Sequence, residues 1–275
     1  MYKILEKHLL AEGIFKIKIS APLIAEKFKP GQFVVLMVNE TGERIPLTIF
    51  DGDVAEGSIT LVFQEVGKTT SLLASKKVSE ELFSVLGPLG RPSAVSKFGN
   101  TAVIGGGVGV AEAYPEAKAL KKAGNYVIGV AGFRTAKKLF MVDDLKEFCD
   151  ELYISTDDGS VGYRGFVHEV LRNLVAKKKI DYVYAVGPVP MMKAVSDVTR
   201  PLNIRTTISA NPIMIDGTGM CGVCRLEVGG TSRFACVEGP EFDAHQVNFE
   251  LLEARLRMYR HEEHVCRLQE EGRHK

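Results

Sequence analysis

A run of glycines, Gly105-Gly106-Gly107-Val108-Gly109, constrains the fold of this chain more than any other feature. It follows an apolar stretch, Thr101 to Ile104, and precedes a helix-like stretch from Ala111 to Ala123. A second apolar stretch, Tyr126 to Ala131, completes a β-α-β unit. Glycine permits a tight turn and lets the N–H groups that begin a helix approach a pyrophosphate. The loop therefore predicts a nucleotide site, with a tight turn that binds no ligand as the alternative.

The strand and helix patterns continue beyond this unit. Leu152 to Thr156 and Tyr182 to Val186 are typical of strands, with a helical stretch from Gly165 to Ala176 between them. We therefore expect residues 99–210 to form an α/β domain with a parallel sheet. Asp157 and Gly187-Pro188 each follow a strand, and the carboxyl ends of parallel strands meet at one edge of a sheet. These residues are expected to line the same nucleotide site as the glycine loop.

The first 98 residues show a different pattern. Short apolar or alternating segments, Ile14 to Ile19, Gln32 to Val38 and Ser58 to Val66, are separated by turn residues. Such spacing predicts a small antiparallel β-barrel over residues 1–98.

Three of the five cysteines lie close together near the C-terminus. Cys221 and Cys224 form a C-x-x-C pair, and Cys236 follows. Plant-type 2Fe-2S sites have the spacing C-x4-C-x2-C followed by a distant fourth cysteine, and Asp216 stands at the first of these positions. A carboxylate can ligate iron as a harder donor than thiolate. We therefore predict a 2Fe-2S module over residues 211–246, held by Asp216, Cys221, Cys224 and Cys236. Residues 211–245 are rich in Gly and Cys with few periodic segments, so we expect them to form a loop around the cofactor.

Other assignments of these residues remain open. A lone C-x-x-C also occurs in half of a zinc ribbon or in a redox pair. His245 is a rival fourth ligand, whereas Cys149 and Cys266 are expected to be ordinary residues. The charged segment 247–275 has apolar residues at helical spacing, which predicts a surface or partner-docking helix.

Charge and hydropathy exclude several classes of protein. The 35 basic residues nearly balance the 34 acidic ones, so no overall field attracts nucleic acid or an acidic membrane. No run of about 18 apolar residues is present, and Met1 to Leu10 carries charges where a secretory signal would be apolar. We expect a cytoplasmic protein that binds neither nucleic acid nor membranes.

Four motifs together resemble the ferredoxin-NADP reductase superfamily, over roughly residues 1–205. They are Arg44-Ile45-Pro46-Leu47-Thr48, Gly67-Lys68-Thr69-Thr70, the glycine loop, and Gly187-Pro188 with Met191. The resemblance implies a flavin-binding barrel before a nicotinamide-binding domain. It implies that the Arg44 guanidinium pairs with flavin phosphates, that Thr48 hydrogen-bonds the isoalloxazine ring, and that Gly67 to Thr70 holds the diphosphate. Alone, Arg44 would be interpreted as a solvated strand residue.

Two positions depart from the pattern of that superfamily. Val186 stands where many members have cysteine near the nicotinamide, which argues against a fast free-standing reductase. Glu112 stands where many members have proline. Arg134 could meet a 2'-phosphate, so NADP(H) remains possible beside NAD(H).

With the cysteine module included, the whole chain resembles two related groups. One is the electron-transfer subunit of dihydroorotate dehydrogenase. The other is the small subunit of NADH-dependent ferredoxin:NADP oxidoreductase, whose cluster has one Asp and three Cys ligands, and Asp216 favours this group. The resemblance implies FAD, a 2Fe-2S cluster and NAD(H). It also implies a heterodimer with a larger flavin and 4Fe-4S subunit that bifurcates electrons and serves ferredoxin indirectly.

Two alternatives to this function are kept. The chain could serve dihydroorotate oxidation, or it could be a sensor of nucleotide or redox state that catalyses nothing. The Arg44 to Thr48 and Gly67 to Thr70 motifs argue against the sensor, because a sensor has no need of a flavin.

Overall fold

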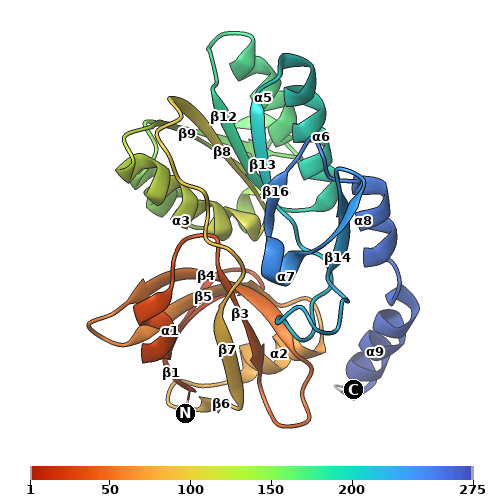
Figure 1. Ribbon diagram of the computed structural model, residues 1–275. Coiled ribbons are helices and arrows are strands. Elements are labelled where there is room, and N and C mark those ends of the chain that lie inside the picture. The colour runs from red at the N-terminus through yellow and green to blue at the C-terminus, as the bar shows by residue number, and fades with distance from the viewer. Residues whose placement is uncertain (1, 274–275) are drawn as a thin grey trace.

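The N-terminal part of the chain is a nearly closed antiparallel barrel, as expected. The computed structural model describes the backbone of residues 2–273 and the side chains of residues 2–266. Seven strands pair in the order β6-β1-β2-β5-β4-β3-β7 (Figure 1). Alternating side chains such as Ile17, Ile19, Ile59 and Leu61 fill its interior. The elements are β1 (Tyr2–Ala11), β2 (Ile14–Ser20), α1 (Pro22–Lys27), β3 (Phe33–Met37), β4 (Ile45–Asp53), β5 (Ser58–Gln64), α2 (Lys68–Ser75), β6 (Glu81–Leu82) and β7 (Ser84–Leu89).

A mixed sheet, mostly parallel, forms the second domain. Its order is β11-β10-β9-β8-β12-β13-β16, and only β16 runs antiparallel to its neighbour. The first strands of this sheet are β8 (Asn100–Gly106), β9 (Tyr126–Phe133), β10 (Glu151–Thr156) and β11 (Tyr163–Arg164), and it continues with β12 (Tyr182–Val186), β13 (Arg205–Ser209) and β16 (Glu241–Asp243). The chain leaves β8 toward β9 and β10, and later returns on the other side of β8 with β12 and β13. The switch point of the sheet therefore lies between β8 and β12.

Helices cover both faces of this sheet. The helices α3 (Gly109–Lys122) and α4 (Val142–Glu147) pack on one face, where Val110, Ala117 and Leu145 are buried. On the other face lie α5 (Val167–Val175) and α6 (Val189–Thr199). Two short 3-10 helices, η1 (Ala136–Lys138) and η2 (Arg200–Leu202), complete the connections. The apolar runs predicted as strands are continuous because both sides of the sheet are covered.

The C-terminal part has more regular structure than its composition indicates. Within the expected loop the chain forms a hairpin of β14 (Arg225–Val228) and β15 (Thr231–Phe234), then α7 (Ala235–Glu238) and β16. The hairpin strands are only four residues long and half exposed, so they leave no clear period in the sequence. Because β16 pairs with β13, the segment 211–246 shares a sheet with the domain before it.

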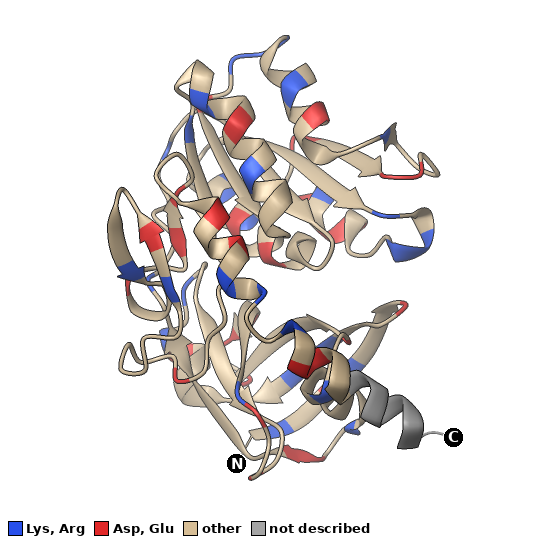
Figure 2. Ribbon diagram, turned by 90° about the vertical axis from the view of Figure 1, so that its right-hand side faces the viewer, with Lys and Arg blue, Asp and Glu red and all other residues tan. Residues whose placement is uncertain are grey.

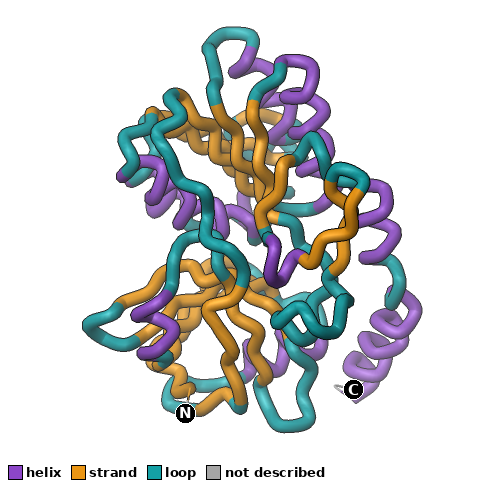
Figure 3. The backbone as a smooth tube through the Cα atoms, in the orientation of Figure 1, coloured by secondary structure: helices purple, strands orange, loops and turns teal. Residues whose placement is uncertain are grey.

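The charged end of the chain forms two helices rather than one. They are α8 (Phe249–Leu256), which packs on α6, and α9 (Arg260–Arg273), which lies beside α2 of the barrel (Figure 1). The tube in Figure 3 shows the long loop between β13 and β14 descending onto the barrel. Basic and acidic residues are interspersed over both domains (Figure 2). In the described part of the chain, no helix is both long enough and apolar enough to span a bilayer.

Candidate functional site

The glycine loop lies at the switch point of the parallel sheet. Cβ atoms added to Gly105 and Gly109 would come within 2.7 Å of Val110 Cα and 2.5 Å of the Val186 carbonyl oxygen. These two glycines therefore let α3 begin directly against β8 and β12. Gly107 differs, because it has a φ of +57° and a Cβ there would meet nothing within 4 Å. The loop thus presents open space above Gly107 at the N-terminus of α3, which suits a phosphate.

The structure brings Gly187 and Pro188 beside this loop but places Asp157 further along the sheet edge. A Cβ on Gly187 would lie 3.0 Å from the Gly106 carbonyl oxygen, so the two loops are in contact. Asp157 follows β10, which is separated from β8 by β9. It is exposed at the same edge, two strands from the glycine loop. The expected convergence therefore applies closely to Gly105–Gly109 and Gly187-Pro188, and less closely to Asp157.

The Arg44 to Thr48 motif begins strand β4 on the side of the barrel that faces the second domain. Thr48 Oγ1 donates a hydrogen bond of 2.9 Å to Glu112 Oε2 in the first turn of α3. Leu47 instead packs against the barrel core, so only its backbone is available to a ligand. Arg44 is exposed. The two outward-facing positions, Pro46 and Thr48, alternate with Leu47 along the strand.

The Gly67 to Thr70 motif forms the start of helix α2. Thr70 Oγ1 accepts hydrogen bonds from the backbone N–H groups of Val66 and Gly67, at 2.9 and 3.0 Å. Thr69 donates to Glu43 at 3.2 Å, which ties α2 to the residue before Arg44. Lys68 is exposed, and a Cβ on Gly67 would meet nothing within 4 Å. The motif thus offers a cation and an open glycine at a helix N-terminus, a combination that suits phosphate oxygens.

The three clustered cysteines lie in the loop before β14 and in helix α7. Cys224 and Cys236 are buried with their Sγ atoms 3.2 Å apart, and both are free thiols. Cys221 is exposed at the loop surface. Burial and the neighbouring Cys224 raise the pKa of the Cys236 thiol to about 12, and the Cys221 charge acts in the same direction. Two buried soft donors beside a third, in a loop of positive-φ glycines, are the donor set that an iron–sulfur cluster needs.

Asp216 lies at the start of the cysteine loop, close to the barrel. It accepts hydrogen bonds from the backbone N–H and the hydroxyl of Thr218. These bonds and the Arg44 guanidinium lower the pKa of Asp216, so its carboxylate is ionised near the barrel motif. A Cβ on Gly217 would lie 2.7 Å from Leu89 Cδ1 and 3.0 Å from Val35 Cγ2, so the loop rests directly on β3 and β7.

The structure does not gather all four expected ligands around one point. Among the residues that it describes, no group of three or more His, Cys, Asp and Glu side chains has the geometry of a metal site. Cys224 and Cys236 are together, whereas Cys221 and Asp216 lie on the loop above them. Three thiolates and a carboxylate repel one another because all four are negatively charged. We therefore expect these side chains to come together only when they bind a metal ion.

The rival ligands have other contacts. His245 Nε2 lies 2.9 Å from Thr199 Oγ1, in the connection between β16 and α8. Cys149 packs against β9, and burial raises the pKa of its thiol to about 12. Cys266 lies in α9.

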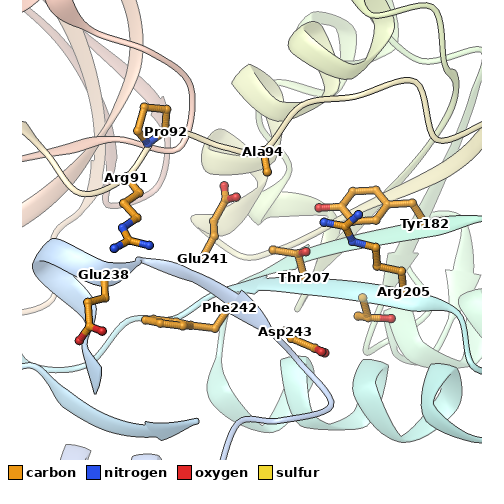
Figure 4. A pocket seen from close by; sticks show the side chains of 11 residues that line it. Arg91, Pro92, Ala94, Tyr182, Arg205, Thr207, Glu238, Glu241, Phe242 and Asp243 are labelled. Carbon is orange, nitrogen blue, oxygen red and sulfur yellow. The ribbon is translucent and has the colours of Figure 1, made fainter. Parts of the chain in front are cut away.

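Two glutamates, one buried and one half-buried, were not anticipated from the sequence. Glu116 of α3 is 2% exposed, and its Oε2 atom has no hydrogen-bond partner among the described residues. Glu241 of β16 borders a pocket of about 340 Å³ between the sheet and the linker 90–99. In Figure 4 its carboxylate points toward linker residues Pro92 and Ala94. Single glutamates in unrelated segments give no sequence signal, since only the fold brings them together.

Comparisons with known proteins agree with this arrangement. Residues 211–248 match the family described as the iron-sulfur cluster binding domain of dihydroorotate dehydrogenase B. A Thermotoga maritima protein named as an electron transfer subunit homolog of dihydroorotate dehydrogenase B (NAD(+)) is 46% identical, over 96% of this chain and 93% of its own. The Fusobacterium nucleatum electron transfer subunit of that enzyme is 34% identical, over 88% of this chain and 95% of its own. A solved structure of an NADH-dependent reduced ferredoxin-NADP oxidoreductase, described for flavin-based electron bifurcation, is 44% identical. It superposes with a TM-score of 0.93 over 98% of this chain and 97% of that one.

Proposed function

This chain belongs to the family of the electron-transfer subunits of dihydroorotate dehydrogenase B and their homologues, and on that premise we propose its function. It is the FAD and 2Fe-2S subunit of an NAD(P)H oxidoreductase complex. It exchanges hydride with NAD(H) at one end and single electrons with a partner subunit at the other.

The barrel motifs supply the FAD contacts in this proposal. Arg44 and the start of α2, with Gly67, Lys68, Thr69 and Thr70, would hold the diphosphate. The outward side chains of Pro46 and Thr48 and the backbone of Leu47 would lie along the isoalloxazine ring. The exposed Arg44, the open Gly67 and the outward direction of Thr48 support these roles.

The glycine loop supplies the NAD(H) site. The turn is shaped by Gly105, Gly106, Val108 and Gly109, and Gly107 leaves room for the pyrophosphate. Gly187 and Pro188 would hold the nicotinamide half, since their loop contacts Gly106 at the switch point. Asp157 would reach the nucleotide only from two strands away, so its contact would be with a distal part of the ligand.

The cluster ligands are Asp216, Cys221, Cys224 and Cys236. The free, buried pair Cys224 and Cys236 supports this set, and the matched iron-sulfur domain spans all four residues. The cysteine loop rests on β3 and β7 of the barrel, and this contact supports a short distance between the cluster and the proposed flavin site.

A bound flavin accepts two electrons as hydride and passes them on singly, and a 2Fe-2S cluster carries one electron at a time. The residues of this chain bind and orient these groups in sequence. The α3 terminus would hold the nucleotide, and Thr48 and Arg44 would hold the flavin between the domains. The cysteine loop rests on the barrel, with Asp216 near Arg44. This order produces a path from NAD(H) to the surface-exposed side of Cys221.

The proposed partner is a larger flavin and 4Fe-4S subunit that bifurcates electrons and exchanges them with ferredoxin. The likeness to the bifurcating oxidoreductase, at 44% identity and a TM-score of 0.93, supports this partner. Asp216 at the first ligand position supports the same choice. The alternative is that the chain is the electron-transfer subunit of an enzyme that oxidises dihydroorotate. The names of the relatives support this alternative. A cytoplasmic location remains a prediction from the sequence.

The observation that carries the proposal is that the helix of the glycine loop and the cysteine loop both contact the barrel. Thr48 touches the helix of the glycine loop, and Gly217 of the cysteine loop packs on Val35 and Leu89. Purification of the native complex under anaerobic conditions tests it. A co-purifying larger flavoprotein with 4Fe-4S clusters supports bifurcation, whereas a dihydroorotate-oxidising subunit supports the alternative.

A further inference from the structure

The proposed reaction leaves a proton inside the protein, and the following inference rests on that function. Oxidation of NADH yields NAD⁺, one proton and two electrons. A 2Fe-2S cluster carries electrons only. For each NADH oxidised, one proton therefore remains at the flavin site and has to reach solvent, and the reverse reaction has to bring one in.

A hydrogen-bonded carboxyl group stands at the inner end of a possible route. Thr48 Oγ1, at the proposed flavin face, donates to Glu112 Oε2 at 2.9 Å. Burial raises the pKa of Glu112 above its ordinary value, and the bond from Thr48 offsets part of this effect. Glu112 is therefore able to hold a proton next to Thr48.

Glu116 continues the route along α3. It follows Glu112 by four residues, so the two side chains lie on the same face of the helix with Cβ atoms about 6 Å apart. Glu116 is 2% exposed, and its Oε2 has no hydrogen-bond partner among the described residues. A buried carboxylate oxygen without a partner is costly unless a proton or a transient donor satisfies it. The Glu116 environment thus favours a carboxyl group that takes up and releases a proton.

Glu241 and Ser93 connect Glu116 to the surface. Ser93 Oγ donates to Glu241 Oε1, and Ser93 also lies close enough to Glu116 to lower the pKa of that carboxyl. Burial raises the pKa of Tyr184, and the charges of Glu241, Glu116 and Glu112 raise it further. Glu241 borders the pocket of about 340 Å³, whose rim includes the exposed residues Arg91 and Arg205 (Figure 4).

Charged and titratable groups from several elements surround Glu116 and Glu241. The linker contributes Arg91, β13 contributes Arg205, and β16 contributes Asp243, all at the pocket. Glu238 of α7 lies at the same rim, and Tyr182 and Tyr184 of β12 line the sheet side. Desolvation is the main cause that raises the pKa of Glu116 and of Glu241, and their mutual repulsion raises that of Glu241 further.

We propose that Glu112, Glu116 and Glu241 form a carboxyl relay that carries one proton between Thr48 at the flavin site and the pocket lined by residues 91–94. In the direction of NADH oxidation, Glu112 accepts the proton through the Thr48 hydroxyl, and Glu116 and Glu241 pass it to water in the pocket. Two electrons leave toward the cluster and one proton leaves toward solvent, so charge and atoms balance. In the reverse direction the same groups carry the proton inward.

Infrared spectroscopy tests the resting state of the relay without any turnover. At neutral pH the wild-type protein should show a protonated carboxylic acid band, and Glu116→Gln and Glu241→Gln should each remove or shift it. Glu250→Gln is the matched control, since Glu250 is exposed and paired with Lys193. A band that is absent from the wild type, or unchanged in both relay variants, contradicts a shared buried proton.

Proton release during a single turnover tests the function of the relay. The flavin is reduced with one equivalent of NADH and then mixed with a one-electron acceptor in weak buffer containing a pH indicator dye. In the wild type and in Glu250→Gln, dye protonation should follow flavin re-oxidation without delay. In Glu116→Gln and Glu241→Gln it should lag by about tenfold or more, and Glu116→Asp should restore most of the rate.

The two experiments can show that the relay is wrong independently of the proposed function. If the relay variants re-oxidise and release the proton as the wild type does, the relay is wrong and the function stands. If NADH does not reduce the flavin of the wild type, the function is wrong. In that case the flavin can be reduced photochemically, and the delay between flavin re-oxidation and dye protonation can be measured in the same way. If the relay variants show no such delay, the relay is wrong.

Discussion

The Sγ atoms of Cys224 and Cys236 lie 3.2 Å apart, although the two residues come from the end of one loop and from the helix after a hairpin. The hairpin β14–β15 returns the chain so that the two buried thiols meet. Both thiols are free, and their closeness therefore has to be stabilised by surrounding packing or by a shared ligand. The second explanation leads to the first prediction.

Asp216→Ala should make the 2Fe-2S cluster labile, with iron and sulfide lost roughly tenfold faster than from the wild type. Asp216→Cys should keep the cluster but shift its reduction potential and its electron paramagnetic resonance spectrum, because thiolate is a softer donor. Iron and sulfide assays with potentiometry check both outcomes.

The control for this prediction is Asp158→Ala. Asp158 accepts bonds from the N–H and hydroxyl of Ser160, as Asp216 does from Thr218, but follows β10. Unchanged cluster content, spectrum and potential in Asp216→Ala would place the fourth ligand elsewhere.

Arg44→Ala should weaken FAD retention, because it removes a charge-assisted contact to phosphate. The expected loss is about 1.5 to 3 kcal/mol, or roughly 10- to 150-fold in Kd. Titration of the apoprotein with FAD measures it, with Arg172→Ala, an exposed residue of α5, as the control. Equal affinity in both variants would remove Arg44 from the flavin site.

Gly107→Val should block NAD(H) while the flavin stays bound. The side chain would enter the open space above the loop, and we expect about 100-fold weaker binding, or about 2.8 kcal/mol. Gly124→Val is a matched control for backbone strain, since Gly124 also has a positive φ, of +82°, and no side chain closer than 4.0 Å. Flavin reduction by NADH at the wild-type rate in Gly107→Val would show that the nucleotide site is misplaced.

Glu116→Gln should stabilise the fold, and more so at high pH. Burial raises the pKa of Glu116 to about 7, and burial with the Glu116 charge raises that of Glu241 to about 8. The folded state therefore favours the protonated carboxyls, whose contribution to stability is complete below the unfolded pKa of about 4.5 and is lost as pH rises through those folded values. Removing one titrating group should raise stability by on the order of 2 kcal/mol above about pH 8.

Thermal unfolding at low and high pH measures this gain. The Tm advantage of Glu116→Gln should shrink as the pH falls toward about 5. Glu250→Gln should show no such trend, because Glu250 is exposed and paired with Lys193. A Tm advantage that does not change with pH would contradict the raised pKa of Glu116.

Local periodicity was enough to predict the two main domains. The apolar strand before Gly105 and the helix after Gly109 follow directly from residue type, and β8 and α3 confirm them. The barrel strands are also confirmed, because one buried face produces an alternating pattern. The expected continuous loop was wrong in part, since the short, half-exposed strands β14 and β15 have no such pattern.

Functional residues could be predicted only where they lie close together in the sequence. The glycine loop and the C-x-x-C pair are local, so spacing identifies them. Glu116, Ser93 and Glu241 come from a helix, a linker and an edge strand, and they meet only because β16 adds to β13. The distance of Asp157 from Gly107 likewise depends on strand order, which the sequence does not specify directly.

Anaerobic titration of the purified chain with NADH tests the central claim most directly, with flavin absorbance and electron paramagnetic resonance recorded together. The purified chain should carry about one FAD and one 2Fe-2S cluster. NADH should bleach the flavin and produce the spectrum of the reduced cluster in the same protein. In Gly107→Val both cofactors should remain bound, but bleaching and cluster reduction should require about 100-fold more NADH. A chain that carries both cofactors but is not reduced by NADH, or one that binds no flavin at all, would contradict the account.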